Sequence, residues 1–105
     1  MALDEAAKER LRRLHKDSRA LLDMLADRLT EQQLSWSRTF SDVGEWSMLV
    51  DSLCAYLVKG NIPVTPAERD AVAAVLAQFT RPKPQHEYLD DPAGTLAALN
   101  VMEER

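Results

Sequence analysis

Residues 42 to 79 contain two apolar, helix-like stripes separated by a short connector with a strongly specified backbone. The connector reads Gly60-Asn61-Ile62-Pro63-Val64-Thr65-Pro66. Gly60 and Asn61 both tolerate the left-handed conformation that ends a helix. Thr65, Pro66 and Glu68 then supply an N-cap, a proline at the first helical position and an acid three residues after the cap, which together start a helix. This stretch therefore predicts a helix–connector–helix unit.

The rest of the chain shows the same helical spacing of apolar residues, and no strand-like alternation. In residues 45–59, apolar side chains cover most of the circumference of the expected helix, so we expect this helix to lie in the centre of the core. The sequence predicts an all-α protein, a compact bundle of four to five helices with a long N-terminal helix, folded as one domain over residues 1–105. The expected helices cover about residues 3–29, 31–43, 45–59 and 66–79, and a short helix follows Asp91-Pro92 within the proline-interrupted tail, residues 80–105.

Local signals define the ends and faces of these helices. Thr30 with Gln33 fits a capping box, and Gly44 is a candidate C-cap. Val43 is expected to face inward and Trp46 to lie in the core. At ~1.5 Å per residue the first helix is longer than the domain needs, so it bends, breaks near Asp17-Ser18 or projects as an arm.

In the last helix we expect three apolar residues on one face. These are Leu96, Leu99 and Met102.

Charge and composition exclude several classes of protein. The chain has 13 Lys/Arg and 17 Asp/Glu, a net charge of -4, which disfavours binding to nucleic acid. It has no apolar run that could span a membrane and no signal-peptide pattern. The single Cys54 cannot form an internal disulfide. We therefore expect a soluble, cytoplasmic protein.

The residues that could carry chemistry are few and isolated. His15 lies on a charged helix and His86 in a loop, and neither has metal ligands at a suitable spacing. Cys54 lies in the middle of an apolar helix, where a buried thiol is the expected state. Glycine-rich phosphate loops are absent from the sequence. We expect no catalysis, no metal and no cofactor.

The acidic residues of the central segment suggest a binding surface. Asp42, Glu45 and Asp51 surround the start of the expected helix 45–59, and Glu68 and Asp70 lie in the first turns of the helix 66–79. Acids near helix N-termini also have an ordinary structural role, because they oppose the helix dipole. The alternative is an acidic patch for a basic partner, with Trp36 and, if it is not in the core, Trp46 as aromatic anchors at its edge.

One segment resembles a known family. It comprises Val43-Gly44-Glu45-Trp46, then Leu49 to Cys54 with Leu57, then the Ile62-Pro63-Val64-Thr65-Pro66-Ala67-Glu68 connector. This segment is similar to small helical bacterial immunity proteins, the Maf-type immunity proteins and their uncharacterised actinobacterial relatives. The resemblance covers residues 40–79. Glu45 matches the acid in the family's turn, and Asp51 matches the acidic position of the following helix.

The resemblance implies an inhibitor that binds and neutralises a polymorphic toxin domain, often a nuclease. An acidic inhibitor suits the basic substrate groove of a nuclease.

Two alternatives remain open. The leucine stripe of the helix 3–29 is a candidate surface for pairing with a second copy or another helix, as in a structural or assembly module. The basic residues of that helix also leave nucleic-acid contact as a weaker alternative, which steep salt dependence would reveal.

Overall fold

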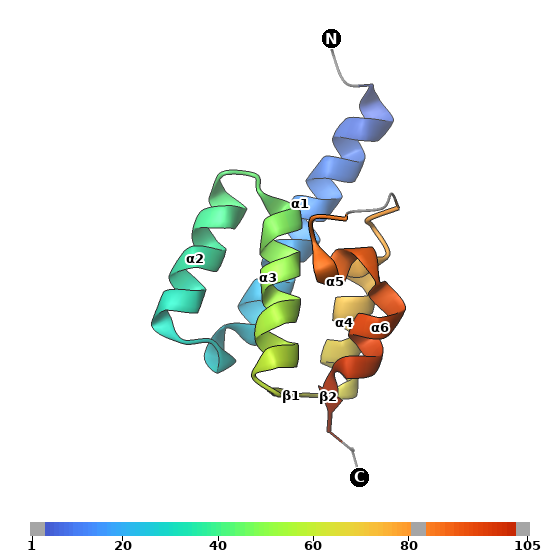
Figure 1. Cartoon of the computed structure of the whole chain (residues 1–105). Coiled ribbons are helices and arrows are strands. Elements are labelled where there is room, and N and C mark those ends of the chain that lie inside the picture. The colour runs from blue at the N-terminus through green and yellow to red at the C-terminus, as the bar shows by residue number, and fades with distance from the viewer. Residues whose placement is uncertain (1–3, 81–83, 103–105) are drawn as a thin grey trace.

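The computed structural model describes residues 4–80 and 84–102 (Figure 1). Within these residues the chain forms six α-helices, which confirms the all-α prediction. In chain order the elements are α1 (Glu5–Leu25), a 3₁₀ turn (Ala26–Arg28), α2 (Glu31–Asp42), α3 (Trp46–Lys59), β1 (Pro63–Val64), α4 (Pro66–Leu76), α5 (Glu87–Asp90), α6 (Pro92–Ala98) and β2 (Asn100–Val101).

The long helix α1 begins at an Asp4 N-cap, whose side chain accepts a hydrogen bond from the Ala7 backbone N–H at 2.7 Å. The helix is continuous through Ser18, which is buried, and ends at Leu25 instead of residue 29. Its C-terminal half packs in the core, and its N-terminal turns project beyond the other helices (Figure 1). The molecule is accordingly elongated, with extents of 48 × 28 × 27 Å. We call the projecting part, residues 4–16, the arm.

Helix α3 is central, as its sequence predicts. It packs against α1, α2, α5 and α6 and contributes five buried apolar side chains, Leu49, Val50, Leu53, Cys54 and Leu57. The core around it is completed by leucines of α1 and by the buried face of α4, whose Val72, Val75 and Leu76 point inward. The position of α3 explains why so few of its residues are polar.

Both predicted capping boxes are present. Thr30 caps α2 together with Gln33, and Thr65 caps α4 together with Glu68. Gly44 has φ +78°, the left-handed conformation expected after α2. In the connector after α3, Asn61 adopts the left-handed conformation, with φ +49°, whereas Gly60 is right-handed.

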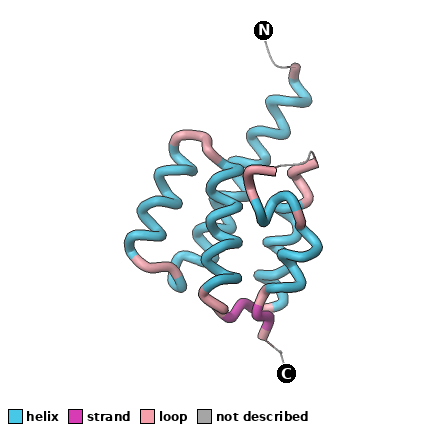
Figure 2. The backbone as a smooth tube through the Cα atoms, in the orientation of Figure 1, coloured by secondary structure: helices cyan, strands magenta, loops and turns pink. Residues whose placement is uncertain are grey.

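The predicted helix after Asp91-Pro92 is present, capped by Asp91 and bearing Leu96, but it is shorter than expected and does not include Leu99 or Met102. Helix α6 ends at Ala98, and the next residues pair in parallel with β1, so that Val101 lies opposite Val64 (Figure 2). Met102 is not helical, because its backbone N–H donates to the Val64 carbonyl at 2.8 Å. The extended connector exposes backbone groups that the tail satisfies, and this pairing replaces the last helical turn. A further short helix, α5, lies in the tail.

Helix α2 is packed differently from its neighbours. Its buried residues are Ser37 and Ser41, with Leu34 and Phe40 half-buried beside the core. The expectation that Val43 faces inward was wrong, because this side chain is 65% exposed. Val43 is the C-cap residue, where the chain already turns away from the helix towards Gly44, so helical spacing no longer determines its direction.

Candidate functional site

The outer face of α2 and the turn after it display large side chains to solvent. Trp36 is 54% exposed, and Val43, the C-cap residue of α2, is also exposed. The Trp36 ring rests against the Phe40 ring, with centroids 6.2 Å apart. Glu45, in the turn, is exposed and has no ion-pair partner among the described residues. We call Trp36, Asp42, Val43 and Glu45 the corner surface.

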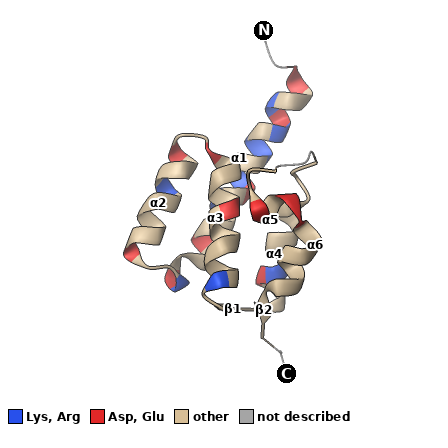
Figure 3. Ribbon diagram, in the orientation of Figure 1, with Lys and Arg blue, Asp and Glu red and all other residues tan. Residues whose placement is uncertain are grey.

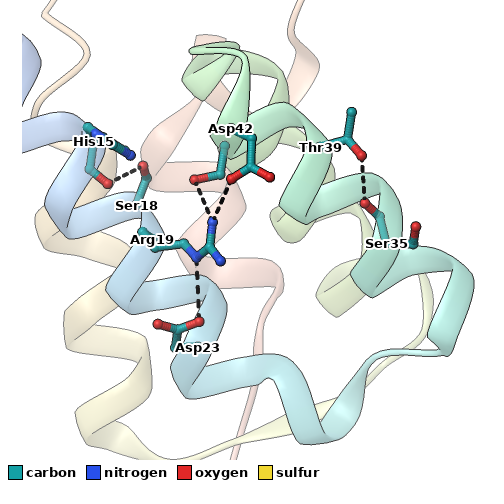
Figure 4. A network of polar contacts seen from close by, with 8 residues as sticks. His15, Ser18, Arg19, Asp23, Ser35, Thr39 and Asp42 are labelled. Atoms are coloured by element: carbon teal, nitrogen blue, oxygen red, sulfur yellow. Dashed lines mark hydrogen bonds and ion pairs between the residues drawn. The ribbon is translucent and has the colours of Figure 1, made fainter.

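Asp42 is the member of the corner surface that is tied to another helix. Its carboxylate accepts a hydrogen bond from Arg19 of α1 at 3.1 Å, and the same guanidinium lies 3.7 Å from Asp23 (Figure 4). The Arg19 group also donates to Ser41 Oγ at 3.3 Å. Asp42 remains mostly exposed, so its contribution to stability is small, whereas its charge stays available to a partner.

Asp51 has an internal role instead of a surface one. Its Oδ1 accepts hydrogen bonds from the backbone N–H groups of Tyr88 at 2.9 Å and Leu89 at 3.3 Å. Its other oxygen lies 3.9 Å from His86 Nδ1. Asp51 therefore satisfies the start of α5 and holds the tail against α3, and α5 lies on the other side of α3 from α2 (Figure 3).

The two acids of α4, Glu68 and Asp70, have different roles. Glu68 is buried, bonded to Arg28 and to the Thr65 backbone N–H. The Arg28 hydrogen bond holds the pKa of the Glu68 carboxyl below its usual range, although burial opposes this, and raises the pKa of Arg28. Asp70 is exposed, 3.7 Å from the neighbouring Arg69. Of these two acids, only Asp70 presents its charge to solvent.

The thiol of Cys54 is enclosed by the core. Burial raises its pKa to about 12, and the nearby Asp51 charge acts in the same direction. The thiol therefore stays protonated at neutral pH, which is the state expected of a buried structural cysteine.

A groove that the sequence did not predict lies between the arm, the start of α3 and the end of α4. It has a volume of about 650 Å³. Its lining includes Arg10, Leu11, Arg13 and Leu14 of the arm, Gly44 to Ser47, and Ala77 to Thr80. We call it the arm groove.

Trp46, expected in the core, is half-buried in the wall of the arm groove. Its ring stacks on His15, with centroids 5.2 Å apart and an interplanar angle of 22°. Its indole N–H is buried and has no hydrogen-bond partner in the part of the chain that the structure describes. The helical periodicity of residues 45–59 predicts that Trp46 lies on the inward face of the helix. Trp46 is in the first turn of α3, however, where this face extends to the edge of the core.

The leucine stripe of α1 lies largely within the protein. Leu21, Leu22 and Leu25 are almost fully buried, so they are not available to a second helix, whereas Leu11 on the arm is 40% exposed. Any pairing through this stripe is thus confined to the arm.

No described helix is both long and apolar enough to cross a membrane. Within residues 4–80 and 84–102, no three His, Cys, Asp or Glu side chains are grouped as metal ligands. Comparisons with models of protein families, with curated proteins and with solved structures found no match for this chain.

Proposed function

We propose that this protein is a non-catalytic, immunity-type inhibitor that binds a basic toxin domain, such as a nuclease, through the corner surface. The observation that carries the proposal is the packing of α2, which buries Ser37 and Ser41, leaves Leu34 and Phe40 half-buried and displays Trp36 to solvent. Tryptophan is among the residues that dominate binding energy in interfaces.

The charges around Trp36 favour a basic partner. Glu45 has no ion-pair partner among the described residues, and the Asp42 carboxylate is only partly neutralised by Arg19. The whole chain carries a net charge of -4. An acidic surface around an aromatic anchor would speed association with a basic substrate groove and would block it once bound.

Among the acids that the sequence predicts for a binding surface, the geometry favours Asp42 and Glu45. Asp51 and Glu68 are used to hold α5 and α4, so replacing either would test folding more than binding. Asp70 lies on α4, and it provides a useful contrast because its charge is exposed but it lies outside the corner surface.

The experiment has two stages. The protein is first used as bait in a lysate of the native host, and the retained polypeptide is purified and assayed for nuclease or other toxic activity. This activity is then titrated with wild-type protein, Trp36→Ala, Glu45→Lys and Asp70→Lys. We expect stoichiometric inhibition by wild type and Asp70→Lys, and inhibition weakened about tenfold or more by each corner variant.

Three outcomes would overturn the proposal. Equal inhibition of the retained polypeptide by all variants would exclude the corner surface. Toxic activity that the wild-type protein leaves unchanged would exclude inhibition. Retention of only the untagged copy of the bait would favour a self-associating module.

A further inference from the structure

The apolar stripe of α1 continues beyond the core onto the arm. Leu11, Leu14, Ser18 and Leu21 follow one another at three- and four-residue spacing along one side of the helix. Ser18 and Leu21 are buried by the rest of the chain, Leu14 is half-buried and Leu11 is 40% exposed. The stripe therefore leaves the core at the arm groove, where an apolar wall is open to solvent.

The charges of this groove differ from those of the rest of the protein. Arg10 and Arg13 line it, and neither has an ion-pair partner among the described residues, whereas Arg12 pairs with Glu9 at 2.9 Å. Residues 4–16 hold five Lys/Arg and three Asp/Glu, a net charge of +2 in a chain whose total is -4. The groove thus combines apolar contact area with two uncompensated guanidinium groups.

The start of α3 adds hydrogen-bond donors to the same groove. Its N-cap residue, Glu45, makes no side-chain capping bond, so the first backbone N–H groups of the helix are not satisfied by a cap. These groups carry the partial positive charge of a helix N-terminus. Among the described residues of the lining, Glu45 is the one acid, and it comes from the α3 side of the groove, not from the arm.

We propose that the arm groove binds a short acidic segment of a partner protein. An apolar side chain of the segment packs against Leu11, Leu14 and Phe79, and a neighbouring carboxylate meets Arg10 and Arg13, which bind carboxylates through paired N–H donors. Glu45 repels acids from the opposite wall and so fixes the orientation of the segment.

Other occupants fit the groove less well. A second copy would bring the same cations, Lys8 and Arg10, beside the stripe in both arms, and like charges in these positions oppose pairing. A small molecule favours an enclosed pocket that covers most of its surface, whereas the arm groove is open to solvent.

The test is selection of peptides from a phage library of random sequences, displayed against the immobilised full chain. Enriched peptides are synthesised and their Kd values measured by fluorescence anisotropy. We expect an acidic residue beside an apolar one in the enriched sequences, and about tenfold weaker binding to Arg10→Glu/Arg13→Glu. The matched control, Arg12→Glu/Lys16→Glu, makes the same change in net charge outside the groove lining and should leave Kd within about threefold of wild type.

Several results would overturn the proposal. These are the absence of enriched peptides, enrichment of basic sequences, or equal losses in both double variants. Binding of a single-stranded oligonucleotide with the same arginine dependence would assign the groove to phosphates instead. A wild-type dimer in sedimentation equilibrium, lost in Arg10→Glu/Arg13→Glu, would assign it to a second copy. Trp36→Ala should leave peptide binding unchanged, so failure here is distinguishable from failure of the inhibitor proposal.

Discussion

Helices α2 and α3 are consecutive and packed together, yet they contribute to the protein in opposite ways. Helix α3 buries five apolar side chains, whereas α2 buries Ser37 and Ser41 and turns Trp36 outward. Beside these serines, Leu34 and Phe40 pack half-buried against the core. The difference teaches that a helix can be held in a bundle by small and half-buried side chains while its largest side chain stays exposed.

The largest expected effect contrasts one leucine from each helix. Leu53→Ala in α3 removes a buried side chain and should lower the free energy of unfolding by about 3 kcal/mol. Leu34→Ala in α2 removes a half-buried one and should cost about 1 kcal/mol. Urea unfolding followed by circular dichroism measures both. Equal losses would show that α2 is as firmly anchored as α3.

The second contrast concerns alkaline pH, because α3 buries a titratable thiol and α2 buries hydroxyl groups that do not titrate. The pKa of Cys54 rises from 9.0 to about 12 on folding. Between these values the unfolded chain loses a proton that the folded chain keeps, so the free energy of unfolding should fall by about 1.4 kcal/mol per pH unit. Below pH 9 this contribution is constant.

The control for this pH dependence is Cys54→Ala, which removes the thiol but leaves the other titrating groups. Its free energy of unfolding should fall less steeply than that of the wild type above pH 9. Parallel pH profiles for the two proteins would show that the thiol is accessible to solvent.

A third contrast compares the acids of the two helices. Asp51→Ala removes the acceptor of two backbone N–H groups of α5 and should cost about 1.5 kcal/mol. Asp42→Ala removes an exposed ion pair and should change stability by less than about 0.5 kcal/mol. Thermal unfolding of both variants tests this order, and the reverse order would mean that Arg19, not Asp51, is the important tether.

The last contrast predicts a gain in stability. Ser37 Oγ is buried and has no hydrogen-bond partner among the described residues, so Ser37→Ala should raise the free energy of unfolding by about 1 kcal/mol. Ser41→Ala, which removes an acceptor for Arg19, should give no gain. A loss of stability in Ser37→Ala would show that this hydroxyl is satisfied in solution.

The parts of the fold that were predictable are those determined by residues a few positions apart. Each capping box joins side chain and backbone three residues apart, so Thr30 and Thr65 identified the starts of α2 and α4 from local sequence alone. The central position of α3 was also predictable, because its apolar residues surround most of the helix. The sequence shows which residues are acidic, but it did not reveal which of these acids are exposed and which hold other helices in place.

The features that the sequence did not reveal depend on distant partners. Asp51 has the same local surroundings as an exposed helix acid, and only the fold brings Tyr88 to it across 37 positions. The β1–β2 pair likewise joins Val64 to Val101, and strands of two residues leave no periodic pattern to detect. The predicted positions of Trp46 and Val43 were wrong because helical periodicity shows which face of a helix a residue is on, but not where the helix or the core ends.

The pairing of β1 with β2 also orders events during synthesis. In the sequence, helices α4, α5 and α6 all come after β1 and before β2. The side of α3 that α5 covers therefore stays exposed until residues 87–101 have left the ribosome. At roughly 5–20 residues per second that interval lasts seconds. We therefore expect the nascent chain to collapse around α1, α3 and α4 before the strand pair forms, because pairing closes a long loop and lowers the chain entropy.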